Sequence, residues 1–504
     1  MELTPPAPTA TETPHQGKPT LFVECSNTYF SSEQSGIQRV VRNVLRHAAV
    51  VAERHGYLLV PVVFEGGQFR EADLQQVLDD KLQVRKLDHW TIGLKERWGQ
   101  WRAMSPRQKI LGACLPVYRL VRRTMAYVLP FPAVHRFLFA HPRDFGLGWC
   151  VLLPWRAVRK LWGGVAGTSS VLTLVATSPV DDRFGMSLDS VADHHGNILL
   201  MLDGSWNFAP WPAVARFQDS GGLAVSVIYD LIPITHPDAF MPSLCDAFNG
   251  WMAEHLRVTR RFVTISRTVA GELDTYLRRV TVGEADPGPW YISSFHLGSE
   301  LDFVDPDLLP SDTVRAIFDG PEHVFIVVGS IEPRKNHAFI LDAFDLLWEQ
   351  GGTARLVVIG RHGWRNEAVM ARMAEHPLAG RQLFLMRGMA DSELDYAYRQ
   401  ASALVIASEA EGFGLPIVEA FQRGLPVLCS DIPVFREIAE GHADFFSLSQ
   451  PSCLTEAVLT FMREHDPALR AERHRQPWIS WRESTEQLLG VVLGEMVEAE
   501  ASVG

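Results

Sequence analysis

The sequence predicts an α/β protein built from two doubly wound, Rossmann-like domains that face each other across a cleft. At 504 residues the chain is too long for one hydrophobic core, which favours two or three domains. Its composition, 47% hydrophobic and 21% charged, is that of an ordinary globular protein. Short apolar runs alternate with helical patterns in both halves, as expected for parallel sheets covered on both faces.

The C-terminal half has the clearest alternation. Strands are expected at 323–330, 354–360, 382–388, 403–408 and 426–430. Helices are expected between them, at 336–350, 366–375, 391–400 and 415–423. Ligands of such sheets bind beyond the carboxyl ends of the strands, so the residues that follow these strands are the candidates for a site.

The N-terminal half repeats the pattern with interruptions. Strands are expected at 20–26, 57–65, 197–206, 223–233 and 261–267. A loop at 27–36 and a helix at 37–56 follow the first strand, and the Pro- and Gly-containing segment 286–302 is expected to be a linker or hinge. The first domain is therefore predicted at 20–300 and the second at 301–475. Residues 1–19, rich in Pro and Thr and without an apolar signal segment, are expected to be a disordered leader.

A basic and aromatic insert at about 90–165 interrupts the first domain. Between residues 95 and 160 there are 13 Lys or Arg against two acids, in a chain whose net charge is −12. Its apolar runs are broken by Pro and fall short of the roughly 20 residues that span a bilayer, so we expect the insert to lie on an anionic membrane. A helical subdomain packed on the acidic remainder, or a surface for a protein partner, would explain the same composition.

The acidic balance argues against a nucleic-acid partner, for which a basic domain would be expected. The cysteines lack the spacing of a zinc site or disulfide framework, which favours a reducing, cytoplasmic compartment. There are six: Cys25, Cys114, Cys150, Cys245, Cys429 and Cys453.

Arg334 and Lys335 stand in "GSIEPRKNH" (329–337), after the first strand of the second domain and before a helix. Exposed amides and the positive end of the helix dipole point to the same place, so this segment suits a diphosphate. A solvated basic helix start, with Glu332 as a local partner, would account for it equally well.

The stretch "EGFGLPIVE" (411–419) follows a buried strand and opens a helix at Pro416. Gly412 and Gly414 let the backbone approach a ligand closely, since they carry no Cβ. Glu411, in the loop, is placed to accept hydrogen bonds from sugar hydroxyls, and Glu419, one turn into the helix, could grip vicinal hydroxyls such as those of a ribose. The alternative is a carboxylate that merely favours the first turns of a helix.

These segments resemble glycosyltransferase family 4, the retaining nucleotide-sugar transferases of GT-B fold. The resemblance rests on "EPRKN", "EGFGLPIVEA" and "GLPVLCSDIPVFREI" and is strong over 320–440. It is weaker at 35–43, 227–240 and 295–302, and 478–490 resembles the helix of segment 476–504 with which such enzymes cross back to the first domain.

The resemblance implies roles for individual residues. Lys335 would contact the donor diphosphate with Arg334 beside it, Glu411 would hold the transferred sugar, and Glu419 would bind the ribose. The remaining donor residues would be the amides of Phe413, Gly414 and Leu415, together with Gly36 from the opposite wall. A basic residue found in many members is replaced here by Ser330 and Ile331.

Acceptor-side candidates follow strands of the first domain. Where many relatives have His-Asp, this chain has Tyr229 and Asp230; Asp230 could orient the acceptor hydroxyl or the donor sugar, whereas Tyr229 cannot be a base near neutral pH because the phenol pKa is about 10. The other candidates are His236, Asp203 and Trp206, for which loop, capping or packing roles fit as well.

The resemblance implies front-face attack, in which the acceptor hydroxyl passes its proton to the departing phosphate. Apart from Asp181 and Asp182 in an expected loop, no acidic metal motif is present, so metal-independent catalysis without a cofactor is predicted. The predicted function is hexosyl transfer, with GDP-mannose favoured over a UDP- or dTDP-sugar, to a glycan or polyprenyl-linked saccharide at the inner face of the membrane, as a peripheral enzyme of surface polysaccharide biosynthesis. Alternatives are another GT-B enzyme, such as an epimerase or phosphorylase, and a non-catalytic sugar-nucleotide sensor or scaffold.

Overall fold

The computed structural model describes residues 18–30, 35–78, 184–206, 208–281, 289–302, 304–305, 307–463, 477–495 and 497. These residues belong almost entirely to one compact unit, formed by residues 1–78 and 186–504. The predicted leader up to residue 17, the basic insert at 90–165 and the Asp181–Asp182 pair lie outside the described residues.

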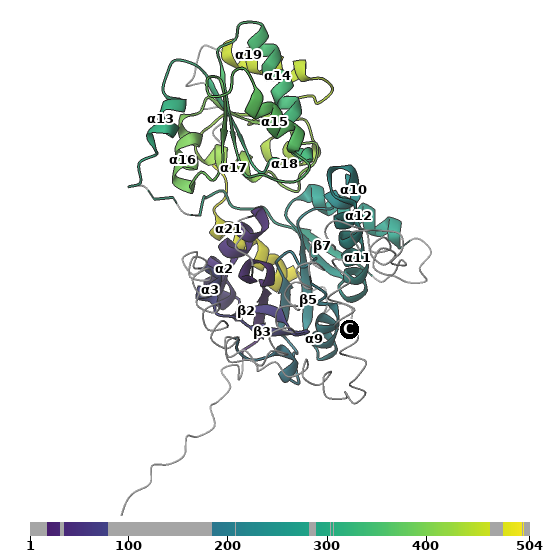
Figure 1. Ribbon diagram of the computed structural model, residues 1–504. Helices are drawn as coiled ribbons and strands as arrows, with labels where there is room; N and C mark the ends of the chain where they lie inside the picture. Colours follow the sequence, from purple (N-terminus) through teal and green to yellow (C-terminus); the bar gives the residue numbers. More distant parts are fainter. Residues whose placement is uncertain are drawn as a thin grey trace, which may run out of the picture. The chain divides into compact units, whose positions relative to one another are not determined.

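A seven-stranded sheet organises the N-terminal half, in the order β3-β2-β1-β4-β5-β6-β7 (Figure 1). Every neighbouring pair of these strands is parallel except β2 and β3, which form a hairpin at one edge. The strands are β1 (Thr20–Glu24), β2 (Leu58–Glu65), β3 (Gln68–Glu71), β4 (Ile198–Met201), β5 (Leu223–Ile228), β6 (Arg261–Thr264) and β7 (Tyr291–Ser294). All residues of β1 and β5 are buried, because helices and loops cover both faces of the sheet.

Capping side chains fix the first residues of two helices that pack on this sheet. Ser35 and Gln38 form a reciprocal capping box that fixes the start of α2. Ser266 caps α12 by accepting a hydrogen bond from the Val269 amide. The helices are α1 (Ser26–Phe30), α2 (Gly36–Arg54), α3 (Leu74–Leu78), α9 (Trp211–Asp219), α10 (Ile232–Thr235), α11 (Pro242–Val258) and α12 (Arg267–Val280), with 3₁₀ turns at Leu188–Ser190 and Pro237–Ala239.

A six-stranded, wholly parallel sheet organises the second half, in the order β10-β9-β8-β11-β12-β13. Its strands are β8 (Val324–Val328), β9 (Arg355–Ile359), β10 (Leu383–Met386), β11 (Ala403–Ile406), β12 (Val427–Ser430) and β13 (Asp444–Phe446). Its helices are α13 (Asp312–Phe318), α14 (His337–Glu349), α15 (Glu367–Glu375), α16 (Asp391–Gln400), α17 (Leu415–Gln422), α18 (Pro433–Ala439) and α19 (Pro451–Arg463), with a 3₁₀ turn at Pro333–Lys335.

The last described helix returns to the first sheet. A capping box between Ser480 and Glu483 starts α21 (Trp481–Gly490), which packs against α2 and continues as a π-helical turn at Val491–Glu495. Trp481 is 2% exposed, and its ring nitrogen donates to the Glu300 carbonyl at 3.0 Å. The C-terminal segment is thereby fixed to the residues that precede the second sheet.

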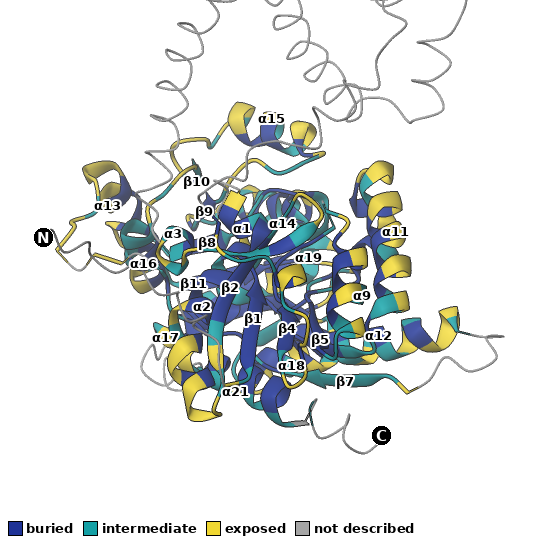
Figure 2. Ribbon diagram, turned by 90° about the horizontal axis from the view of Figure 1, so that it is seen from below, coloured by how far each residue is buried: buried dark blue, intermediate teal, exposed yellow. Residues whose placement is uncertain are grey.

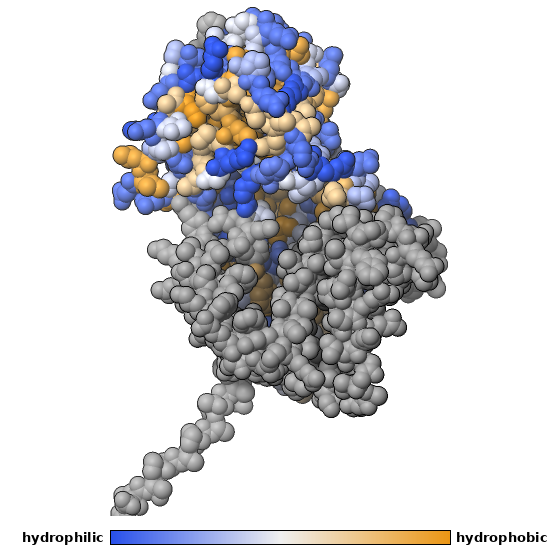
Figure 3. All heavy atoms as spheres, in the orientation of Figure 1, coloured by the Kyte–Doolittle hydropathy of each residue, from blue (hydrophilic) through white to orange (hydrophobic). Residues whose placement is uncertain are grey.

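Each sheet has its own apolar core. Phe22, Leu199 and Phe262 belong to the core of the first sheet, and Phe325, Leu341 and Val405 to that of the second. In Figure 2 the central strands are buried, whereas α11 and α15 turn exposed residues outward. Hydrophilic residues predominate on the face of the second half seen in Figure 3, with hydrophobic ones gathered near its middle.

The predicted fold class, an α/β GT-B fold of two Rossmann-like domains, is confirmed by these two helix-covered sheets, of which the first is parallel except for β3 and the second is wholly parallel. Two local predictions were wrong. The expected loop at 27–36 begins with helical residues that belong to α1, and the expected linker at 286–302 contains β7, which pairs with β6. No helix among the described residues is long and apolar enough to cross a membrane.

Candidate functional site

Two loops meet at the carboxyl edge of the second sheet. Strands β8 and β11 are parallel neighbours, so the segments that follow them, 329–336 and 407–414, leave the sheet side by side. The Glu409 amide donates to the Arg334 carbonyl at 2.8 Å and ties one loop to the other. Asn336 takes a left-handed conformation (φ 55°), which Asn tolerates, between the turn and α14.

Glu411 is the centre of a charged cluster, here called the Glu411 cluster, in which its carboxylate binds two cations and a hydroxyl. Oε1 pairs with Lys335 Nζ, and Oε2 lies 2.6 Å from Arg334 Nη1. Ser408 Oγ donates to Oε1 at 2.9 Å, and Arg334 Nη2 lies 2.7 Å from Glu332 Oε1. The structure therefore brings together Arg334, Lys335 and Glu411, three predicted donor-site residues from two separate loops.

The charges of this cluster are strongly coupled. Burial alone would raise the pKa of Glu411, but Arg334 and Lys335 outweigh it and lower that pKa to about 2. Burial works against the charge of Arg334 as well, yet Glu411, Glu332 and Asp230 raise its pKa above the ordinary value. Both partners thus remain ionised at neutral pH.

Asp230 lies close enough to the Glu411 cluster to interact with it electrostatically. Burial raises the pKa of its carboxyl, Arg334 lowers it, and Glu411 raises it again. Oδ1 accepts a hydrogen bond from the Ile232 amide at 3.0 Å, which fixes the side chain at the start of α10. Among the predicted acceptor-side residues, Asp230 is therefore one that interacts with the predicted donor-side residues Arg334 and Glu411.

The glycine loop contacts the chain itself. A Cβ on Gly412 would lie 2.2 Å from the Tyr229 carbonyl oxygen, and Ser266 Oγ donates to the Gly412 carbonyl at 2.8 Å. Gly414 has φ 109°, a conformation that favours glycine, and a Cβ there would meet the Phe435 ring at 2.9 Å. We expected the lack of a side chain at Gly412 to let a ligand approach the backbone. In the structure the residue that follows β5, Tyr229, occupies this space instead.

Glu419 is almost completely buried, at 2% exposure, and both of its carboxylate oxygens have partners. Tyr398 donates its hydroxyl to Oε2 at 2.6 Å, and Arg39 of α2 forms an ion pair with Oε1. Gly36 begins the same helix, and a Cβ on it would lie 3.8 Å from Leu415 Cδ1. The start of α2 and the start of α17 are therefore in contact.

Phe413 is 3% exposed and directs its ring at two aromatic side chains. The ring centroids of His296 and Trp478 lie 5.8 and 6.0 Å away. Its side chain packs in this aromatic group, which leaves the backbone as the part of Phe413 available for the predicted donor contact.

The other acceptor-side candidates do not join the Glu411 cluster. Tyr229 is buried and donates its hydroxyl to the Leu202 carbonyl at 2.8 Å. Trp206 packs against the rings of Phe248 and Trp251. His236 is exposed at the end of α10, and its ring Nδ1 lies 2.9 Å from Thr235 Oγ1.

Asp203 belongs to a buried pair with Glu24, which we had not predicted. Asp203 accepts from the amides of Thr28 and Gly204, and Glu24 accepts from those of Ser26 and Asp203. Burial raises the pKa of both carboxyls, that of Glu24 to about 7. Glu24 is the last residue of β1 and Asp203 follows the neighbouring strand β4, so the pair fixes α1 to the ends of these strands.

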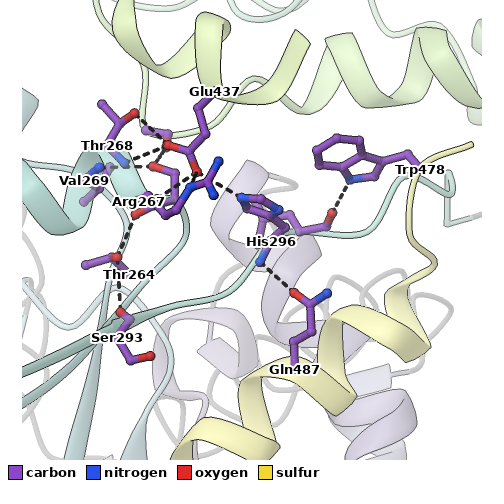
Figure 4. A network of polar contacts seen from close by, with 12 residues as sticks. Thr264, Arg267, Thr268, Val269, Ser293, His296, Glu437, Trp478 and Gln487 are labelled. Carbon is purple, nitrogen blue, oxygen red and sulfur yellow. Dashed lines mark hydrogen bonds and ion pairs between the residues drawn. The ribbon is translucent and has the colours of Figure 1, made fainter. Parts of the chain in front are cut away.

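Glu437 of α18 makes a second set of contacts with the first half of the chain (Figure 4). Its carboxylate accepts from the amides of Arg267 and Thr268, at 2.8 and 2.7 Å, and from the Thr268 hydroxyl at 2.7 Å. His296 Nε2 lies 2.9 Å from Oε1. Burial raises the pKa of Glu437, but these hydrogen bonds lower it by more, to about 2.

Sequence reasoning missed four residues that contact the predicted site residues or their neighbours, Arg39, Tyr398, Ser408 and Glu437, and it missed the partner of Asp203, Glu24. Two of them had a usable signal, because Arg39 lies three residues after Gly36 and Ser408 three residues before Glu411. No group of three or more His, Cys, Asp or Glu within the described residues could hold a metal ion.

The second sheet lies in a segment that is similar to a known protein family. Residues 313–472, which include every member of the Glu411 cluster, match the model of the glycosyl transferases group 1. The matched segment, named here the group 1 domain after that model, spans all six strands of the second sheet.

The curated relatives of the chain include bacterial mannosyltransferases. The serotype-specific mannosyltransferase WbdA of Escherichia coli is 33% identical over 279 residues, which are 55% of this chain and 34% of that protein. The O-antigen chain mannosyltransferase RfbU of Salmonella typhimurium is 26% identical over 213 residues, 42% of this chain and 53% of that protein. The chain spans about a third of the length of WbdA.

Among solved structures, the α,α-trehalose 6-phosphate synthase of Burkholderia multivorans is similar, with a TM-score of 0.47 and 12% identity. The match covers 63% of this chain and 73% of that one.

Proposed function

We propose that the protein is a retaining glycosyltransferase that moves a hexosyl group, mannose in preference, from a nucleotide sugar to a glycan or lipid-linked saccharide. The observation that supports this proposal is the Glu411 cluster, in which one buried carboxylate lies between the Arg334 guanidinium and the Lys335 ammonium. The group 1 domain supports glycosyl transfer, and the names of the relatives support mannose and the O-antigen class of surface polysaccharide.

In this proposal the donor lies along the carboxyl edge of the second sheet. Lys335 and Arg334 bind the diphosphate, Glu411 accepts from the hydroxyls of the transferred sugar, and Glu419 binds the ribose. The amides of Phe413, Gly414 and Leu415 line the sugar and phosphate at the start of α17, where the helix dipole favours an anion.

The chemical step requires no protein nucleophile. The bond from the anomeric carbon to the diphosphate oxygen breaks, the acceptor oxygen bonds the same face of the sugar, and the acceptor proton passes to the departing phosphate. Lys335 and Arg334 stabilise the negative charge that develops on the leaving group, an effect commonly worth about 3 kcal/mol per donor. Asp230 orients the acceptor hydroxyl or the sugar from the first half of the chain.

We further propose that GDP-mannose is the donor, ahead of UDP- and dTDP-sugars, and that no cofactor takes part. The acceptor is a saccharide carried on a polyprenyl lipid at the inner face of the cell membrane. The net charge of +11 between residues 95 and 160 supports a peripheral position on that anionic surface.

A two-part experiment tests the proposal. Thermal-shift measurements with GDP, UDP, dTDP and ADP identify the nucleotide, because binding to the native state raises the unfolding temperature. Radiolabelled GDP-mannose is then offered with lipid-linked saccharide acceptors, and the anomeric configuration of the product is read by NMR. Transfer with retention is expected; nucleotide binding without transfer to any acceptor would favour a sensor, and an inverted product would contradict the mechanism.

A further inference from the structure

The ion pair between Arg39 and Glu419 connects the first turn of α2 with α17. Glu419 is 2% exposed, and its two oxygens are taken by Arg39 and by the Tyr398 hydroxyl. The Arg39 side chain is 22% exposed, so it is the more accessible of the two ion-pair partners. A ligand that approaches the Glu419 carboxylate therefore meets Arg39 there.

We infer that Arg39 is a positioning residue that competes with the donor ribose for Glu419. The inference rests on the proposed function, in which Glu419 accepts from the vicinal ribose hydroxyls. Tyr398 is itself buried and retains Oε2, so the ribose gains its place by displacing the guanidinium from Oε1. Donor binding is thereby coupled to loss of the ion pair between Arg39 and Glu419.

Arg39 has other acids within electrostatic reach once it leaves Glu419. Asp302 and Asp391 both raise the pKa of the Arg39 guanidinium, after burial has acted to lower it. Asp302 already faces the same helix, since it accepts from Asn43 and lies 3.8 Å from Arg42. When the ribose displaces Arg39, the guanidinium can therefore pair with Asp302 or Asp391. The free-energy cost of leaving an unpaired buried charge is thereby avoided.

Glu419 keeps its position when Arg39 moves away. Arg423 Nη1 donates to the Glu419 carbonyl at 2.8 Å, and Arg423 is in turn fixed by Asp395 at 2.7 Å. The backbone at Glu419 therefore stays in place and the Tyr398 hydroxyl still holds Oε2, so the competition concerns one oxygen atom rather than the whole helix.

Binding of GDP and of 2′,3′-dideoxy-GDP, measured by calorimetry, tests the inference, with the same pair of uridine nucleotides if the thermal-shift panel selects UDP. Arg39→Ala should bind GDP roughly fivefold or more tightly than wild type, within the usual range of coupling between sites. Its affinity for the dideoxy nucleotide should not change, because that ligand has no ribose hydroxyls to offer Glu419. Arg39→Lys, which keeps a cation, should restore most of the wild-type value.

Arg54→Ala is the matched control, since Arg54 lies on the same helix and forms an exposed ion pair with Glu486. It should bind both nucleotides as wild type does. Equal GDP affinities in wild type and Arg39→Ala would overturn the inference while leaving the proposed function intact. Weaker GDP binding by Arg39→Ala would also overturn it, because Arg39 would then be a donor ligand. Failure of the wild type to bind any nucleotide would overturn the proposed function itself.

Discussion

Each oxygen of the Glu411 carboxylate faces a different cation, Oε1 the Lys335 ammonium and Oε2 the Arg334 guanidinium at 2.6 Å. The two cations come from the turn after β8 and the carboxylate from the loop after β11. One carboxylate thus sets the position of both groups that would bind a diphosphate.

Lys335→Ala and Glu411→Ala should each lower the rate of sugar transfer by roughly 100- to 1,000-fold, the range seen when one charge-stabilising donor is removed. Lys335→Ala removes a donor to the leaving group, and Glu411→Ala releases both cations. Transfer from GDP-mannose is measured together with circular dichroism and thermal unfolding. Arg436→Ala, which removes an exposed ion pair with Asp431, is the control and should keep full activity. Near-normal transfer by a folded Lys335→Ala or Glu411→Ala protein would show that the site is elsewhere.

Glu437 should make stability depend on acid pH. Its pKa falls from the ordinary 4.5 to about 2 in the folded chain, so its stabilisation is full above pH 4.5 and is lost as the pH falls toward 2. Glu437→Gln should therefore lose stability near pH 6 but show a weaker dependence between pH 5 and 3 than wild type. Urea unfolding at each pH measures this. Parallel curves for the two proteins would contradict the role of the carboxylate charge.

Gly412→Ala should disturb the contact between the glycine loop and the end of β5. The new Cβ would lie 2.2 Å from the Tyr229 carbonyl oxygen, so one backbone must move, at a cost of about 1–3 kcal/mol in unfolding free energy. Transfer activity should fall as well, because the neighbouring Glu411 moves with the loop. Gly271→Ala, at a site with open space in α12, is the control and should not be destabilised. An unchanged unfolding temperature for Gly412→Ala would show that the contact is not maintained in solution.

The basic insert should promote membrane binding. Sedimentation with vesicles containing anionic lipid should carry down the full chain but not a form lacking residues 95–160, since each Lys or Arg near the surface contributes about 1 kcal/mol. Added salt should release the protein by screening these charges. Equal sedimentation of the two forms would refute a membrane role and favour a protein partner.

Catalysis should not depend on a divalent cation. Transfer from GDP-mannose is measured before and after treatment with EDTA, and the rate should be unchanged because Lys335 and Arg334 carry the charge of the leaving group. Loss of activity that Mn²⁺ or Mg²⁺ restores would contradict this prediction.

The sequence predicted best those elements whose apolar pattern is local. Helix α16 has the expected bounds, 391–400, and the central strands β1, β5 and β11 lie within their expected runs. Strand β7 was missed because its four residues are only partly buried and lack an apolar run, so nothing in "YISS" distinguishes it from the surrounding linker-like residues. Its assignment depends on pairing with β6, which is a tertiary contact.

Site prediction had a similar limit. Arg334, Lys335 and Glu411 were assigned to one donor site through the family resemblance, and the structure shows that their loops follow neighbouring parallel strands, which meet at one edge. The pairing of Arg39 with Glu419 spans 380 positions and depends on how α2 meets α17, for which no local pattern exists. Trp206 was an acceptor candidate on sequence grounds because an aromatic side chain after a strand suits a sugar as well as a core; here it packs on other aromatic rings.

The Ser266 hydroxyl contacts both halves of the chain through a single atom. It accepts from the Val269 amide at 3.2 Å and donates to the Gly412 carbonyl at 2.8 Å. Ser, Thr, Asp and Asn are ordinarily interchangeable at the start of a helix. Here an ionised aspartate would accept a hydrogen bond from the Val269 amide but would repel the Gly412 carbonyl oxygen. The position therefore requires a side chain that both donates and accepts a hydrogen bond. In the sequence Ser266 looks like an ordinary first residue of a helix. In the structure it also limits which substitutions can keep the hydrogen bond to the glycine loop.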